Sequence, residues 1–172
     1  LQLFFACEGW EMEVSILALT AAQCERIIKN PLLIDEWFFL EGEEPPKTPF
    51  RYEDMNLGRS WHGIHYLINK DGDVDRSKPP GSYAVFGKHP IADERLGVVS
   101  CRYLLPGEVL ELFQHVSLLN KKDLSANFNA RLMNEMKIYP QGTWTDSMFD
   151  SLYEVFEELV NFYRIVSKKG KC

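Results

Sequence analysis

The residues best suited to chemistry lie in one apolar stretch, SWHGIHYLI, at positions 60–68. It holds His62 and His65, and an imidazole can carry a proton near neutral pH or bind a transition metal. A zinc-protease helix spaces its histidines four residues apart with a glutamate after the first, whereas these are three apart and Gly63 occupies the glutamate position. We therefore expect no metal here. Two alternatives remain for His62: a general acid–base role, or a hydrogen-bonding role within the fold.

A helical pattern distinguishes the two histidines. On a helix over about 53–69, the core-facing stripe would consist of Leu57, Trp61, Ile64 and Ile68. His65 would then border the core, whereas His62 would turn toward solvent or a groove. We therefore expect stability to depend on His65, and His62 to tolerate substitution.

Other patterns that resemble ligand sites fail on spacing. The run from Asn69 to Asp75 alternates oxygen-bearing side chains, but no register puts glycine and glutamate where a calcium loop needs them. The stretch GKHP, at 87–90, lacks the second glycine and the hydroxyl of a phosphate loop, and G-x-S-x-G and G-x-G-x-x-G are absent. We therefore expect neither a metal nor a cofactor.

Composition and charge exclude several classes of protein. The chain has 172 residues, 13% of them aromatic, and a net charge of −6, which argues against binding to nucleic acid. The opening stretch LQLFFACEGWE has no basic segment and too short an apolar run for a signal peptide or a membrane span. The four cysteines are scattered without a C-x-x-C pair, which predicts reduced thiols and a cytoplasmic protein.

The elements predict a helix-rich α+β single domain with a small, mostly antiparallel sheet packed by helices. We interpret residues 1–11 as an N-terminal extension, of cloning origin or from an upstream start, and residues 12–172 as the domain. Strands are predicted at 13–20, 82–89 and 97–105, and their order cannot be read. Helices are predicted at 20–30, opened by a Thr20–Gln23 capping box, and at 32–40, 53–69, 106–120, 121–137 and 145–169. An acidic, proline-rich loop covers 41–49.

Three segments in this order resemble the YfbM-like family of bacterial proteins, a domain of unknown function. They are NLGRSWHGIHYLI, AVFGKHP with ERLGVVSCRYLLPGEVLEL, and NARLMNEMKIYPQGTW before a long amphipathic helix. The resemblance covers about residues 12–169 and implies a single cytoplasmic α+β domain with no assigned reaction. The residues that match the pattern are Arg59, Trp61, His62, His65, Gly87, Tyr139, Pro140 and Trp144.

Two classes of function follow from these observations. The first is a non-catalytic binding or regulatory protein, such as an inhibitor of another protein, because aromatic side chains can anchor an interface and no catalytic signature is present. Its binding candidates are Arg59, Trp61, His62, Tyr139 and Trp144. The alternative is a small hydrolase or transferase that uses His62, with His65, near an aromatic-walled cleft. We expect the partner to be another protein, and we predict no oligomeric state.

Overall fold

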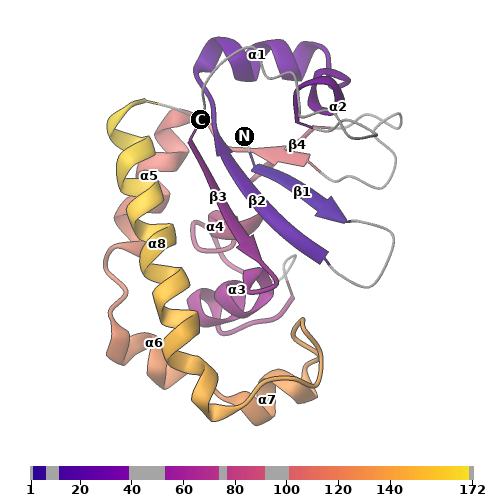
Figure 1. The fold of residues 1–172 in the computed structure, drawn as a ribbon. Coiled ribbons are helices and arrows are strands. Elements are labelled where there is room, and N and C mark those ends of the chain that lie inside the picture. Colours follow the sequence, from indigo (N-terminus) through magenta and orange to yellow (C-terminus); the bar gives the residue numbers. More distant parts are fainter. Residues whose placement is uncertain (1, 7–11, 39–52, 74–76, 92–100, 171–172) are drawn as a thin grey trace.

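The computed structural model describes residues 2–6, 12–38, 53–73, 77–91 and 101–170 (Figure 1). In these residues the fold is built around a five-stranded antiparallel sheet. Its strand order is β3-β2-β1-β5-β4. The strands are β1 (Gln2–Ala6), β2 (Met12–Ala18), β3 (Glu53–Gly58), β4 (His89–Ile91) and β5 (Cys101–Tyr103). With helices packed around it, this sheet confirms the predicted helix-rich α+β class.

The first strand lies in the middle of the sheet. β1 pairs with β2 from Gln2 opposite Ile16 to Ala6 opposite Met12, and its other edge pairs with β5, where Leu3 lies opposite Cys101. This position is at odds with the expectation that residues 1–11 lie outside the fold, because a central strand supplies hydrogen bonds to two neighbours. Whether the segment is native stays a prediction.

The helices cover both faces of the sheet. They are α1 (Ala21–Lys29), α2 (Leu33–Phe38), α3 (Trp61–Asn69), α4 (Tyr83–Phe86), α5 (Pro106–Val116), α6 (Lys121–Asn127), α7 (Ala130–Glu135) and α8 (Phe149–Lys168), with a 3₁₀ turn, η2 (Asp146–Met148), before the last. Successive residues of β2 point to opposite sides: Ile16 packs in a large core with α3, α5 and α8, and Leu17 in a smaller one with α1 and α2.

Several predicted helices form as expected. The Thr20 side chain accepts from the Gln23 amide at 3.3 Å and the Gln23 side chain accepts from the Thr20 amide at 2.7 Å, so the capping box begins α1. Pro106 stands at the start of α5, where a missing N–H costs nothing. The long amphipathic helix predicted at 145–169 forms as α8, whose apolar face is buried at Leu152, Phe156, Leu159, Phe162, Tyr163 and Val166.

The predicted helix over 53–69 is wrong in its first third. Residues 53–58 form β3, in which Met55 and Leu57 are buried while Asp54 and Asn56 are exposed, an alternation typical of a half-buried strand. Gly58 has a φ of +49°, a backbone conformation that glycine adopts without strain, and it ends the strand. The helix begins only at Trp61.

Two further elements differ from the prediction. Where a strand was expected over 82–89, the chain forms the short helix α4 followed by β4. The prediction failed because Ala84, Val85 and Phe86 are all buried, and such an apolar run has no hydrophobic periodicity that distinguishes a strand from a helix. The expected helix over 121–137 is interrupted between α6 and α7, where Asn129 accepts from the Leu132 amide and caps the new helix. The loop at 41–49, Asp75 and residues 97–100 lie outside the described residues.

One cysteine differs from the expectation of reduced thiols. Cys24, on α1, is 4% exposed and disulfide-bonded, and its partner lies outside the described residues. Cys101 is a buried thiol. The prediction of a reduced thiol is therefore wrong for Cys24. In the described part of the chain, every helix is too short or too polar to cross a bilayer.

Candidate functional site

His62 connects three segments through its imidazole ring. Its Nε2 lies 2.8 Å from the carbonyl oxygen of Gly72, and its Nδ1 accepts from the backbone amide of Tyr139 at 2.9 Å. Because a carbonyl can only accept, Nε2 carries the proton and the ring is neutral. Burial lowers the pKa of His62, while the bond to Gly72 acts in the opposite direction. The ring is half-buried rather than turned to solvent, so the expected exposure of His62 is wrong.

His65 is completely buried, as predicted for the histidine that borders the core. The Ser77 hydroxyl donates its own proton to the Asp73 carbonyl, so Nε2 of His65 is the donor to that hydroxyl, at 2.9 Å. Its Nδ1 faces the Asn69 amide at 3.4 Å. Burial, with a smaller contribution from the neighbouring His62, lowers the pKa of His65 to about 4. In this arrangement both nitrogens of each histidine are engaged, and neither ring presents a nitrogen to a substrate.

A stack of rings extends outward from His62. The Trp61 and His62 rings are almost parallel, with centroids 4.7 Å apart, and the Tyr139 ring lies 5.7 Å from that of Trp61. The guanidinium of Arg59 lies over Tyr139, 5.7 Å from its centroid. Four of the predicted binding residues are therefore neighbours, although Trp61 is only 8% exposed.

Trp144 is fixed in a separate loop that packs against α3. Its indole N–H donates to the Ile138 carbonyl at 2.9 Å, and Asn134 binds its backbone amide and carbonyl through both side-chain atoms. A Cβ on Gly63 would lie 2.4 Å from the edge of this indole. The absence of a side chain at Gly63 therefore lets α3 pack closely against the loop. This contact gives a structural role to Gly63, which stands where a zinc site would need a glutamate.

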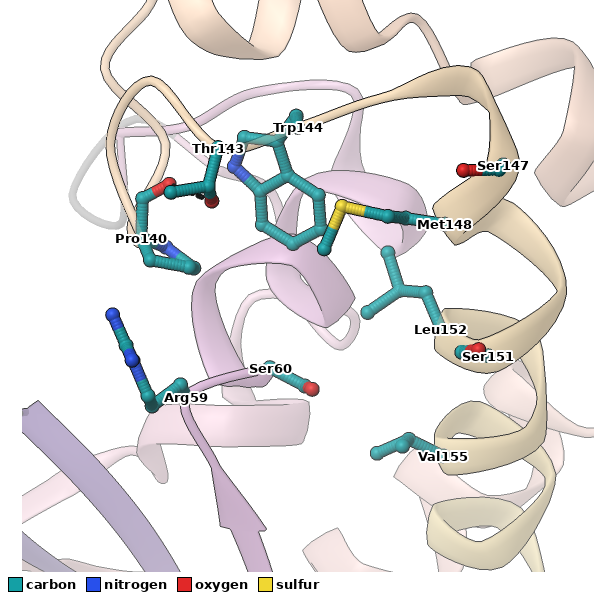
Figure 2. A pocket seen from close by; sticks show the side chains of 10 residues that line it. All are labelled: Arg59, Ser60, Pro140, Thr143, Trp144, Ser147, Met148, Ser151, Leu152 and Val155. Carbon is teal, nitrogen blue, oxygen red and sulfur yellow. Dashed lines mark hydrogen bonds between the residues drawn. The ribbon is translucent and has the colours of Figure 1, made fainter.

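A cleft opens beside this contact, and we name it the Arg59 cleft (Figure 2). It has a volume of about 640 Å³ and three walls: the turn before α3, the loop at 140–144, and the start of α8 with η2. Its lining residues are Arg59, Ser60, Pro140, Thr143, Trp144, Ser147, Met148, Ser151, Leu152 and Val155. Among these described residues, Arg59 is the only side chain that is charged.

The cleft combines residues that the sequence did and did not single out. Arg59 and Trp144 line it, whereas Trp61, His62 and Tyr139 are not among its lining residues. The apolar residues of α8 in the lining, Leu152 and Val155, belong to the apolar face of the predicted amphipathic helix. Ser147 and Ser151 were missed; their only signal is a spacing of four residues along one edge of that face.

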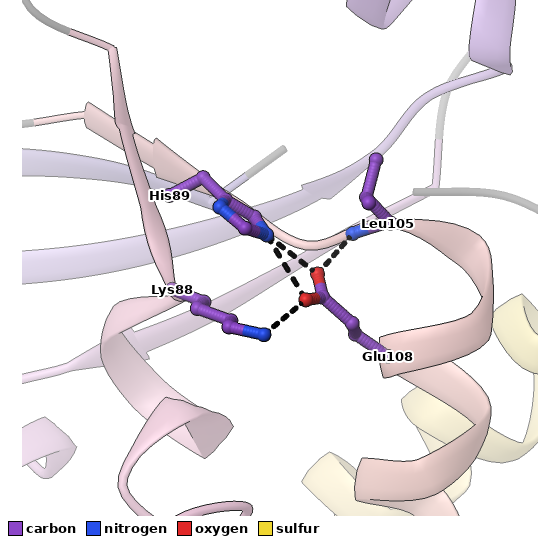
Figure 3. Close-up of polar contacts among 4 residues, drawn as sticks. All are labelled: Lys88, His89, Leu105 and Glu108. Atoms are coloured by element: carbon purple, nitrogen blue, oxygen red, sulfur yellow. Dashed lines mark hydrogen bonds and ion pairs between the residues drawn. The ribbon is translucent and has the colours of Figure 1, made fainter.

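A second polar cluster joins β4 to the start of α5 (Figure 3). The Glu108 carboxylate accepts from Lys88 at 2.6 Å and from the backbone amide of Leu105 at 2.8 Å, and lies 3.0 Å from Nε2 of His89. A carboxylate at this position caps the start of α5 and interacts favourably with the positive end of the helix dipole. The cluster therefore stabilises the junction between β4 and α5. In the part of the chain that is described, no three His, Cys, Asp or Glu side chains gather as metal ligands.

The fold and the cleft together define a class: a helix-rich α+β protein with a central antiparallel sheet and a mixed polar and apolar cleft at the start of α8. The model of the family described as Domain of unknown function (DUF1877) matches residues 11–172. The chain belongs to this family, which confirms the predicted resemblance.

Two comparisons with single proteins agree with this assignment. Protein YfbM of Escherichia coli (strain K12) is 25% identical over 121 residues, which cover 67% of this chain and 71% of that protein. The crystal structure of YfbM from Escherichia coli, described as a protein of unknown function, superposes with a TM-score of 0.69 over 91% of this chain and 94% of that one. At 18% identity, that likeness shows a common fold.

Proposed function

We propose that this protein is a non-catalytic binding or regulatory protein that takes a segment of another protein in the Arg59 cleft. One observation carries the proposal: the cleft places several hydroxyls beside an apolar wall, while the nearest imidazoles have both nitrogens hydrogen-bonded. Such a lining can hold and orient a ligand, and a small number of polar groups on an apolar wall is typical of binding pockets.

The geometry gives less support to the alternative of a hydrolase or transferase that uses His62. A general base needs a free lone pair within hydrogen-bonding reach of its substrate. The lone pair of His62 Nδ1 already accepts from the Tyr139 amide, and the ring lies outside the lining of the cleft. Catalysis by His62 would require this bond to break first.

A bacterial source and a cytoplasmic location belong to the same proposal. The family resemblance supports them. The disulfide at Cys24 is the observation against a cytoplasmic location, because disulfides are rare in reducing compartments.

The proposal is tested by blocking the cleft. Ser151 is exposed on the α8 wall, so Ser151→Trp would fill the cleft without disturbing the core. Ser125→Trp, at an exposed site on α6, is the matched control. Both variants and the wild type would be used for affinity capture from a bacterial lysate, with quantitative mass spectrometry. We expect one partner to be retained by Ser125→Trp and lost by Ser151→Trp; equal capture by both variants would contradict the proposal.

A further inference from the structure

We infer that the outer edge of β3, with the groove between β3 and α8, is a second interaction surface, which takes an extended, basic segment of a partner protein as an added strand. The inference goes beyond the proposed function, because this groove and the Arg59 cleft share no lining residue. It starts from the strand edge, and the groove beside that edge specifies the partner.

β3 lies at one edge of the sheet, on the side of α8 (Figure 1). Its six residues pair with β2 along one side, and within the described part of the chain no strand pairs with the other side. Alternate residues of such a strand direct their backbone N–H and C=O groups away from the sheet. An extended segment can hydrogen-bond to these groups and so add a strand. Six residues span roughly 20 Å, so a segment of about the same length fits.

A groove with a volume of about 410 Å³ lies between this edge and α8. Its apolar lining consists of Met55 and Phe162, each 8% exposed, and the half-buried Ile165. Successive side chains of an added strand point to opposite faces of the sheet. Those on the face of α8 would contact this apolar lining, which favours a segment with an apolar residue at every second position.

The charge of the groove predicts a basic segment. Among the described residues that line it, the charged ones are Glu53, Asp54 and Glu158, all of them acidic. Glu53 is paired with Lys169, whereas Asp54 and Glu158 are exposed and form no ion pair with another described residue. Opposite charges on neighbouring strands stabilise their pairing. Lysine or arginine side chains of an added strand would therefore be attracted to Asp54 and Glu158.

The same charges argue against a second copy of this chain as the occupant. Two β3 edges paired about a two-fold axis would bring Asp54 and Glu158 of one copy close to the same carboxylates of the other. Like charges on paired strands destabilise the pairing, and charged edge strands are one means by which proteins avoid it. The edge is therefore suited to a partner of the opposite charge.

The test uses three synthetic peptides that carry a fluorophore. The lysine peptide, acetyl-Lys-Val-Lys-Val-Lys-Val-amide, presents valine on one face and lysine on the other when it is extended. The glutamate peptide replaces every lysine. The methylated peptide keeps the side chains of the lysine peptide but has a methyl group on every backbone nitrogen, so it cannot donate to a strand. Fluorescence anisotropy would measure the affinities, and backbone amide shifts in NMR would locate the binding.

We expect the lysine peptide to bind at least tenfold more tightly than the glutamate or the methylated peptide, and to shift the amides of residues 53–58. No binding, equal affinity for the glutamate peptide, or amide shifts confined to other elements would overturn the inference. Equal affinity for the methylated peptide would also overturn it, because attraction of charges alone would then explain the binding. A dimer in sedimentation that protects the β3 amides from hydrogen exchange would assign the edge to a second copy instead.

Variants separate this groove from other parts of the surface. Asp54→Asn and Glu158→Gln change exposed side chains, and each should weaken binding of the lysine peptide about two- to fivefold. Glu111→Gln, exposed on α5, is the matched control and should keep the affinity; an equal loss in this variant would contradict the inference. Ser151→Trp fills the Arg59 cleft and should also keep it, so failure of this inference is distinguishable from failure of the proposed function.

Discussion

His62 joins residues that are distant in the chain: Gly72 is ten positions away and Tyr139 is 77 positions away. Two backbone groups thus depend on one side chain, and both are at least partly shielded from water. A buried polar group without a partner costs more than the hydrogen bond itself contributes. The histidine pair is therefore best understood as a connection between α3 and two loops.

We expect His62→Ala to destabilise the protein by about 2–4 kcal/mol, because it removes two hydrogen bonds and the ring that stacks on Trp61. Urea midpoints, at unchanged slope, would measure the loss. Gln141→Ala, exposed in the neighbouring loop, should change stability by less than about 0.5 kcal/mol. A loss for His62→Ala no larger than that of the control would show that water replaces the ring.

Acid should weaken the fold through His65. The unfolded chain takes up a proton near pH 6.5, whereas the buried ring stays neutral until its pKa of about 4. Because the unfolded state binds more protons in this interval, stability is full above about pH 6.5 and falls as the pH is lowered toward 4. The depressed pKa of His62 acts in the same direction.

For His65 alone the decrease is on the order of 3 kcal/mol, from the difference between the two pKa values. Urea unfolding at pH 7, 6, 5 and 4 would measure it. In His65→Gln, which keeps a donor for Ser77, the dependence on pH should be shallower. An identical dependence in this variant would mean that other groups cause the loss.

The state of Cys24 can be counted directly. The chain has four cysteines, and one disulfide leaves two free thiols. We expect two thiols to react in denatured protein that was alkylated during lysis, and four after reduction. Cys24→Ser should release its partner and leave three. Four reactive thiols without reduction would show a reduced chain and would favour the cytoplasmic location.

At the scale of elements, Gly63 sets how closely α3 approaches the Trp144 loop. Gly63→Ala would drive a methyl group to 2.4 Å from an indole whose N–H is held by Ile138. We expect a loss of about 1–3 kcal/mol, typical of overpacking, in thermal or urea unfolding. Gly107→Ala is the control, since nothing lies within 4 Å of its added methyl group in α5. It should be neutral or stabilise by about 0.4–1 kcal/mol. Equal effects at both glycines would contradict this contact.

The sequence predicted elements well where a local signal marked their ends. The Thr20 capping box and Pro106 each act within a few residues, and the apolar residues of α8 repeat at a helical period along its length. It failed at β3, because Leu57 falls on a helical stripe as readily as on one face of a strand. It failed again at α4, where every side chain from Ala84 to Phe86 is buried and shows no period.

The candidate site was predictable only in part. Arg59 and Trp144 were identified through the family pattern, but the cleft exists because Gly63 brings α3 against the loop of Trp144. Contacts between segments so far apart in the chain leave no local trace in the sequence. The same reason explains why His62 was expected to face solvent: its two partners lie in loops whose positions only the fold determines.

At the scale of the whole molecule, the central place of β1 has a direct test. A chain that starts at Met12 would lack the strand between β2 and β5, so the sheet would be divided. We expect it to be insoluble or to lose its cooperative thermal transition, contrary to the expectation that residues 1–11 are dispensable. Adding a peptide of residues 1–11 should restore part of the transition. A melting temperature within about 4 °C of the full chain would show that the strand is an appendage.

The same strand order has a consequence for synthesis in the cell. β1 and β2 can pair as soon as they leave the ribosome, but β5 follows roughly 95 residues after β1. At about 5–20 residues per second, one edge of β1 stays open for roughly 5–20 s. An open edge is a template for pairing with other nascent chains. Ribosome-bound chains that end before Cys101 should therefore be the form of this protein that most needs a chaperone.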